Sequence, residues 1–274
     1  MNKLLGSTVL SVQQVNTGGG SPLSPWPLDS LKDVIPAPCH SHNDYDQEIP
    51  LFEALAAGCI GIEADVWLSG GDVIIGHLLP KAGRTLRAQY VDPLKAIIDH
   101  NGGSAYKSRP DQTLVLLVDF KTSDKGTLDA VVKALDPLRQ AGYLSKVENG
   151  VFKRGAVTIS ASGSAPFDRI SSGDGVPNRD VFYDAPLANL DGADYNRQNS
   201  YTASADFEDV VSSDGNISSD ELTKLRSHVS KAHARGLVAR YCEFNKTPIF
   251  IFSFLFCFLV LCEDIDKVGT NAIS

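Results

Sequence analysis

Apolar runs alternate with amphipathic segments along the chain from about residue 34. Short apolar runs predict buried strands, and apolar residues at a period of about 3.6 residues predict helices. The predicted strands, in chain order, are residues 34–42, 59–68, 73–76, 113–120, 157–160, 181–183, 201–205 and 237–241. The predicted helices are residues 50–57, 92–101, 127–140 and 218–236, and Pro137 is expected to kink or shorten the third.

This alternation of strands and helices favours a parallel sheet in an α/β fold. Polar residues gather where the predicted strands end, as they do at the catalytic face of a barrel enzyme, and the 274 residues suffice for one such barrel of about 250 residues. An open doubly wound sheet usually has a glycine-rich phosphate turn after its first strand, whereas residues 41–45 contain no glycine. We therefore predict a TIM (β/α)8 barrel.

The chain divides into three predicted regions. Residues 1–33 form a lead-in that is rich in Gly, Ser and Pro between residues 16 and 30, and we expect it to be disordered or weakly signal-like. Residues 34–247 form the barrel. Residues 248–274 begin with a stretch of fifteen residues, PIFIFSFLFCFLVLC, that has no charge and no helical amphipathicity.

Three interpretations of residues 248–262 compete. The stretch is shorter than the roughly 20 residues that span a bilayer, although it could insert into a membrane, and it could also be a buried core segment. The third interpretation is a gene-model artefact that replaces the last strand–helix unit. We favour the third because the sequence texture changes abruptly after Tyr241, and we expect a barrel that is incomplete or distorted at its C-terminal end.

Candidate chemistry lies in three pairs of polar residues, each pair one position apart within a strand-like run. The pairs are His40 and His42, Glu63 and Asp65, and Asp119 and Lys121. Residues i and i+2 of a strand point to the same face, so neighbouring strands would bring these side chains together. Buried carboxylates need a positive neutraliser, and carboxylate oxygens suit Mg²⁺ better than zinc. We therefore predict that Glu63, Asp65 and Asp119 hold Mg²⁺.

Because carboxylates are the predicted metal ligands, the histidines are available for acid–base chemistry. His40, His42 and His77 are the candidates, because all three lie at the ends of predicted strands. Imidazole titrates near neutrality, so one ring can accept a proton while another donates one. Lys121 shares the predicted face of Asp119 and could hold a phosphate oxygen or pair with a ligand carboxylate. Arg84 and Arg87 could help to hold a head group, but we favour solvated loop charge as the interpretation of each.

Charge and cysteine content narrow the possible partners. The formal net charge of −8 argues against a nucleic-acid surface, and no run of basic residues marks a polybasic membrane patch. The five cysteines are odd in number and match no zinc spacing, so we expect no disulfide framework. Cys39 and Cys59 are interpreted as small buried apolar residues beside the site strands.

The order of these motifs resembles the phosphatidylinositol-phospholipase-C-like phosphodiesterase superfamily, which includes glycerophosphodiester phosphodiesterases and sphingomyelinase D-like toxins. The matching segments are His42, residues 62–66, His77 and residues 117–122. Residues 40–45 with Pro50-Leu51 resemble most the fungal altered inheritance of mitochondria protein family. The resemblance implies a barrel with one Mg²⁺ on the three carboxylates, a catalytic pair of His42 and His77, and Lys121 at the phosphate, with His40 as a competing candidate for the first histidine.

The predicted function is that of a phosphoric diester hydrolase of the phospholipase D or glycerophosphodiesterase type in lipid metabolism. The substrate would be a phospholipid or a glycerophosphodiester, with peripheral membrane contact and no nucleic acid. Whether water or an internal hydroxyl attacks, which decides between hydrolysis and a cyclic phosphate, stays open. A catalytically inactive phospholipid-binding barrel, a membrane-tethered structural protein and a carbon–nitrogen hydrolase are the alternatives. We favour a secreted or membrane-associated location over a cytoplasmic one.

Overall fold

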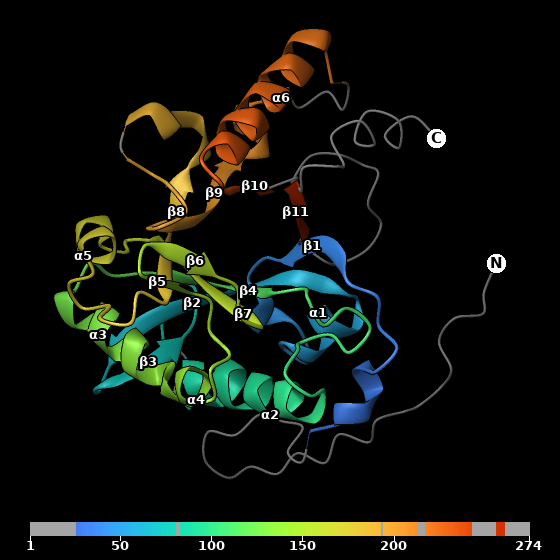
Figure 1. Cartoon of the computed structure of the whole chain (residues 1–274), viewed down its shortest axis with the longest axis vertical. Helices are drawn as coiled ribbons and strands as arrows, with labels where there is room; N and C mark the ends of the chain where they lie inside the picture. The colour runs from blue at the N-terminus through green and yellow to red at the C-terminus, as the bar shows by residue number, and fades with distance from the viewer. Residues whose placement is uncertain (1–25, 81–82, 193, 213–216, 243–255, 261–274) are drawn as a thin grey trace.

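The computed structural model describes residues 26–80, 83–192, 194–212 and 217–242, together with the backbone of residues 256–260. Seven parallel strands form one curled sheet, in which each strand pairs with the next along the chain (Figure 1). In order they are β1 (Ala37–Ser41), β2 (Cys59–Ser69), β4 (Leu114–Phe120), β7 (Val157–Gly163), β8 (Val181–Pro186), β9 (Ser200–Asp206) and β10 (Val238–Cys242).

Two further strands of this sheet run antiparallel to their neighbours. β3 (Asp72–Ile75) forms a hairpin with the end of β2, and β11 (Phe256–Val260) pairs with both β10 and β1. The predicted α/β architecture with a parallel, barrel-like sheet is thus confirmed for seven strands. The eighth position holds an antiparallel strand, so the arrangement is that of an incomplete barrel rather than eight parallel strands. The predicted strand at 73–76 is present, but as a hairpin partner.

Helices are present at the four predicted positions, and α5 (Phe167–Ser172) was not predicted. The helices at the predicted positions are α1 (Phe52–Ala56), α2 (Asp92–His100) after a π-helical turn η3 (Arg87–Val91), α3 (Lys125–Ala134), α4 (Asp136–Gln140) and α6 (Ser219–Ala234). The predicted break at Pro137 separates α3 from α4. The Ser218 hydroxyl accepts from the Glu221 N–H and the Glu221 side chain accepts from the Ser218 N–H, which is the predicted capping box of α6.

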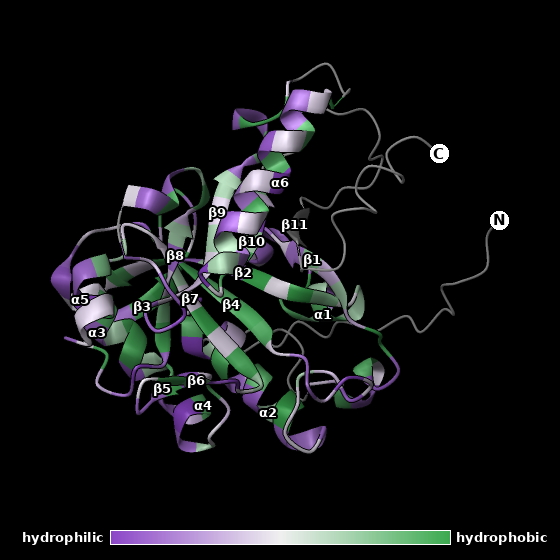
Figure 2. Cartoon of the chain, turned by 45° about the horizontal axis from the view of Figure 1, so that its top comes forward, coloured by the Kyte–Doolittle hydropathy of each residue, from purple (hydrophilic) through white to green (hydrophobic). Residues whose placement is uncertain are grey.

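The core fills the space between the sheet and its helices, and Figure 2 shows the apolar strands at the centre of the molecule. A small hairpin of β5 (Lys146–Glu148) and β6 (Val151–Lys153) was not predicted. Phe152 of this hairpin packs against Phe182 and Tyr201, with ring centroids 5.4 and 5.8 Å away. Both partners lie near the beginning of their strands, so the hairpin covers the amino-terminal end of the sheet and leaves the carboxyl end for chemistry.

Two expectations need correction. Cys39 of β1 and Cys59 of β2 form a disulfide, which the odd cysteine count had led us to discount; the two strands are adjacent and bring the sulfurs together. The predicted lead-in ends earlier than residue 33, because residues Leu28–Leu31 form a 3-10 helical turn in which Leu31 is buried. Residues 1–25 of the lead-in, residues 243–247 at the end of the predicted barrel, and residues 248–255 and 261–274 lie outside the described residues. None of the described helices is both long enough and apolar enough to span a membrane.

Candidate active site

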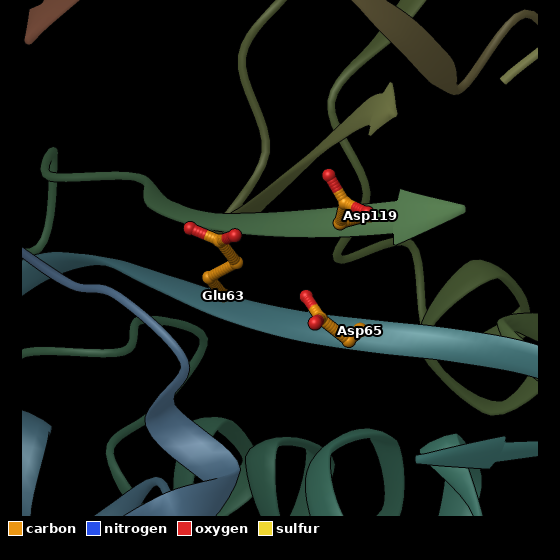
Figure 3. Close-up of side chains that lie close together, drawn as sticks. All are labelled: Glu63, Asp65 and Asp119. Carbon is orange, nitrogen blue, oxygen red and sulfur yellow. The ribbon is translucent and has the colours of Figure 1, made fainter. Parts of the chain in front are cut away.

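Three carboxylates meet on the inner face of β2 and β4. Asp65 of β2 and Asp119 of β4 are directly opposite each other in the parallel register, and Glu63 lies two residues earlier on the face of Asp65. One oxygen of each carboxylate lies within 4.8 Å of the others, so a single ion can be reached by all three (Figure 3). The predicted convergence of these residues follows from the strict alternation of side chains along a strand.

The two oxygens of Asp65 have very different surroundings. Oδ2 lies 2.7 Å from the Tyr45 hydroxyl, 2.8 Å from His77 Nδ1 and 2.9 Å from Lys121 Nζ. Oδ1 is buried and has no hydrogen-bond partner. A buried carboxylate oxygen without a partner is costly, so this atom fits a ligand position directed at a cation.

Lys121 joins the two opposed aspartates. Its Nζ lies 2.9 Å from Asp65 Oδ2 and 2.9 Å from Asp119 Oδ1. Burial opposes the charge of the ammonium group, but the hydrogen bonds to the two carboxylates raise the pKa of Lys121 above its ordinary value. Lys121 is therefore a fixed positive charge at the edge of the carboxylate cluster.

Glu63 is held by a cation that the sequence analysis missed. Arg240 of β10 is buried and its Nη2 donates to Glu63 Oε2 over 2.7 Å. Burial alone would raise the pKa of Glu63, but Arg240, His40 and His42 together lower it to about 2. Glu63 thus stays ionised inside the protein, and Oε2 is the oxygen engaged by Arg240.

His40 and His42 both face Glu63 but differ in access. His40 is fully buried, its Nε2 lies 3.4 Å from Glu63 Oε2, and burial together with Arg240 lowers its pKa to about 4. His42 Nε2 lies 3.7 Å from Glu63 Oε1, and its side chain keeps 16% exposure. His42 is therefore the accessible ring of the two, whereas His40 is a buried, neutral ring.

His77 is the most accessible histidine of the group, with 52% of its side chain exposed. Its Nδ1 is held by Asp65, which leaves Nε2 to face outward. The backbone before it is fixed, because the Gly76 N–H donates to the Asp65 carbonyl and Trp67 Nε1 donates to the Gly76 carbonyl. A carboxylate on one nitrogen and solvent on the other is the arrangement that general acid–base catalysis requires.

The turn after β1 is organised by Asp44, a fully buried carboxylate. It accepts hydrogen bonds from the Leu51 N–H, the Ser41 hydroxyl and the Tyr90 hydroxyl, at 2.6, 2.8 and 2.9 Å. Burial raises the pKa of Asp44 to about 6, although the three donors oppose the shift. These contacts fix the segment that carries His42 and Tyr45.

Two glycines leave room for site side chains. A Cβ at Gly61 would lie 2.2 Å from His40 Nδ1, so only glycine allows the buried ring to pack against β2. Gly163 at the end of β7 has a φ of +63°, and a Cβ there would lie 2.7 Å from Asp119 Oδ1. Ser162, next to it, donates to Asp119 Oδ2 over 3.0 Å.

A cavity of about 430 Å³ opens beside the cluster. Its lining includes His42, Glu63 and Asp119, and Arg240 lies on the wall with Asp184 of β8. Ser204 connects these last two, because Arg240 Nη1 donates to Ser204 Oγ and that hydroxyl donates to Asp184 Oδ1. Of the site residues predicted from sequence, His42, Glu63 and Asp119 line this cavity, and Lys121 pairs with Asp119. Asp65 and His77 are not part of its lining, and Lys121 connects Asp65 to Asp119.

Residues that the sequence analysis did not select include Arg240, Tyr45, Ser162 and Asp184. Arg240 is a lone charge in an otherwise apolar strand, a signal that could have found it. Arg84 and Arg87, considered for a head group, are not part of the cavity lining; Arg84 donates to the Tyr45 carbonyl and Arg87 pairs with Asp92.

Comparison with known proteins identifies the family of this chain. A family model described as the AIM6-like phosphodiesterase domain matches residues 28–184. The altered inheritance of mitochondria protein 6 homolog of Arthroderma benhamiae is 35% identical over 258 residues, which cover 84% of this chain and 79% of that protein. The proteins named altered inheritance of mitochondria protein 6 from Lachancea thermotolerans and Eremothecium gossypii are 32% and 31% identical.

Coverage of these last two relatives is partial. The matches take in 76% and 77% of this chain but only 57% and 61% of the relatives. No solved structure matches the chain. The family expected from the motif order is nevertheless confirmed, because the family model covers more than half of the chain and the Arthroderma protein is similar along most of its length. The chain belongs to the AIM6-like phosphodiesterase family.

Proposed function

We propose that this chain is a Mg²⁺-dependent phosphodiesterase that cleaves the phosphodiester of a phospholipid or a lipid-derived molecule. The observation that carries the proposal is the difference between the two carboxylate oxygens of Asp65. Oδ2 is contacted by three polar groups, whereas Oδ1 is buried without a hydrogen-bond partner. A phosphodiesterase-type domain in the family supports the reaction class.

The donor set fits a hard divalent cation. Glu63, Asp65 and Asp119 offer only oxygen, as Mg²⁺ prefers, and the two fixed cations beside them do not balance three carboxylates. A bound Mg²⁺ would polarise a nonbridging phosphate oxygen and stabilise the charge that develops on it. Lys121 would add a second positive contact at the phosphate.

The two accessible histidines have complementary surroundings. His77 is oriented by Asp65 through Nδ1, so its exposed Nε2 is suited to give a proton to the leaving oxygen. His42 borders the cavity beside Glu63 and is suited to accept a proton from the nucleophile or to attack directly. His40, buried and with its pKa lowered to about 4, serves to support Glu63.

The test is turnover of a panel of phosphodiesters, including bis(p-nitrophenyl) phosphate, glycerophosphocholine and phospholipid vesicles, with Mg²⁺ or with EDTA. Wild type should turn over at least one diester only with Mg²⁺. His77→Ala should lose at least about a hundredfold in kcat, the lower end expected for a general acid. His100→Ala is the matched control, because His100 is a surface histidine paired with Asp29, and it should keep full activity.

The outcomes separate the alternatives. Vesicle binding without cleavage of any diester would favour the inactive lipid-binding barrel. Equal rates with Mg²⁺ and EDTA, or full activity of folded His77→Ala, would refute the proposed chemistry. Analysis of the products of the cleaved diester distinguishes a free phosphomonoester from a cyclic phosphate.

A further inference from the structure

Two neighbouring leucines project into solvent directly after His77. Leu78 and Leu79 are 79% and 74% exposed. Among the described residues, the other large apolar side chains of comparable exposure are Ile35 and Val151, and each stands alone in sequence. Single exposed apolar residues are ordinary, whereas an exposed pair beside a candidate active site marks an interaction surface.

The segment that carries these leucines is anchored on both sides. On one side the Gly76 N–H and carbonyl are held by Asp65 and Trp67. On the other side the Ile75 N–H donates to the Arg84 carbonyl, and Ile74 and Thr85 form a bridge. The residues on both sides of the leucines are therefore tied to β2 and β3.

The local charge is opposite to that of the chain. No acidic residue occurs between Asp72 and Asp92, although the chain as a whole has a formal net charge of −8. Arg84 and Arg87 lie within this interval, and both are exposed. Arg84 donates to the Tyr45 carbonyl, and Arg87 forms an exposed ion pair with Asp92 at the border of the interval, a contact that solvent screens. Apolar residues flanked by basic ones are the combination that binds an anionic membrane surface, by partial insertion and by attraction to phosphate head groups.

We propose that Leu78 and Leu79, together with Arg84 and Arg87, are the surface by which this chain docks onto an anionic lipid surface. This inference rests on the proposed function and extends it, because docking through these residues would bring the site beside His77 close to phosphodiesters in the lipid surface. Exposed leucines would enter the boundary between head groups and acyl chains, and the arginines would contact lipid phosphates. A soluble diester would need no such anchor.

Binding is measured without turnover, by co-sedimentation of the full chain with phosphatidylcholine vesicles that contain or lack phosphatidylserine. The variant is Leu78→Ser/Leu79→Ser. The matched control is Ile35→Ser/Val151→Ser, because these residues are similarly exposed but lie before β1 and in the β5–β6 hairpin, at the opposite end of the sheet. All variants keep residues 248–274, so any contribution of that apolar stretch cancels in the comparison.

Wild type should bind vesicles with phosphatidylserine more tightly than those without, and high salt should weaken that binding. The leucine variant should lose at least about tenfold in vesicle affinity, while the control binds like wild type. Arg87→Gln should bind more weakly at low salt and show a flatter salt dependence. Thermal melting of each variant establishes that it is folded.

Equal vesicle binding by the leucine variant and the control would overturn the proposal. So would a loss of self-association in the leucine variant without any change in vesicle binding, since the leucines would then contact a second copy of the chain. These measurements involve no cleavage, so their outcome does not depend on the proposed hydrolysis. The hydrolysis is tested separately, by the activity of wild type on a water-soluble diester.

Discussion

Arg240 shows how one side chain can determine the ionisation state of a buried carboxylate. It is buried, it contacts Glu63 directly, and it stands 177 residues away in sequence. Its attraction, with that of the two neighbouring histidines, keeps Glu63 ionised at any pH near neutrality despite burial. The guanidinium occupies Oε2 and thereby fixes the direction of the whole carboxylate.

Replacement of Arg240 should therefore destabilise the fold. In Arg240→Met the buried Glu63 loses its counter-ion, and removal of one partner of a buried pair typically costs about 3–5 kcal/mol. Arg240→Lys keeps the positive charge, so its free energy of unfolding should fall by less. Urea unfolding at pH 7 measures both free energies, and a Met variant as stable as wild type would contradict this account of Glu63.

Asp44 makes stability depend on pH in a defined window. Burial raises its folded pKa from 3.8 to about 6, so its folded form binds a proton more tightly than its unfolded form. Its stabilising contribution is present below about pH 4 and is lost as the pH rises through 6, a change of about 3 kcal/mol for two pKa units.

The measurement is the free energy of unfolding of wild type and Asp44→Asn between pH 4 and pH 6.5. Asp44→Asn should be less stable overall, because an amide offers one acceptor oxygen to three donors. Relative to this variant, wild type should lose stability as the pH rises across the window. Parallel pH profiles would show that Asp44 does not titrate as its burial requires.

The strands at the site are tied together covalently as well as by hydrogen bonds. The disulfide between Cys39 and Cys59 joins β1, which leads to His42, to β2, which carries Glu63 and Asp65. It closes a loop with a sequence separation of 20, for which loop entropy predicts about 3 kcal/mol of stabilisation.

Thiol counting tests this bond directly. Cys39 and Cys59 should resist alkylation in the denatured but unreduced protein, and both should react once the protein is reduced, when all five cysteines become reactive. Cys39→Ala/Cys59→Ala should unfold with about 3 kcal/mol less free energy than the oxidised wild type. Five reactive thiols before reduction would contradict the pairing.

Strands and helices with a regular apolar period were predictable, and so was the shared face of Glu63, Asp65 and Asp119, because both follow from local spacing. The disulfide was missed because cysteine parity says nothing about which strands are adjacent. Arg240 and the Asp44 network were missed because their partners depend on tertiary contacts. The β5–β6 hairpin was missed because its strands are only three residues long.

The arrangement of the sheet as a whole depends on a strand near the end of the chain. β11 pairs with both β1 and β10, so it joins the first and last parallel strands. The predicted interruption after Tyr241 matches the point where the parallel order ends, and local spacing could not predict that a strand of opposite direction would follow.

A chain that ends at residue 242 should therefore leave β1 and β10 with unpaired edges, which lower stability and promote aggregation. The comparison is urea unfolding and light scattering of the full chain and of the truncated chain, with a chain lacking only residues 1–25 as control. A truncated chain as stable and monomeric as the full one would mean that β11 contributes nothing to the sheet.

The central claim is that the carboxylates of Glu63, Asp65 and Asp119 bind one divalent cation, beside which the histidines act as acid and base. Calorimetric titration with Mg²⁺ tests it most directly, on wild type, Asp65→Asn and the surface variant Asp99→Asn. We predict one Mg²⁺ per wild-type chain, unchanged binding by Asp99→Asn, and at least about tenfold weaker binding by Asp65→Asn, whose amide replaces a charged ligand. Absence of Mg²⁺ binding by wild type, or equal binding by folded Asp65→Asn, would contradict the account.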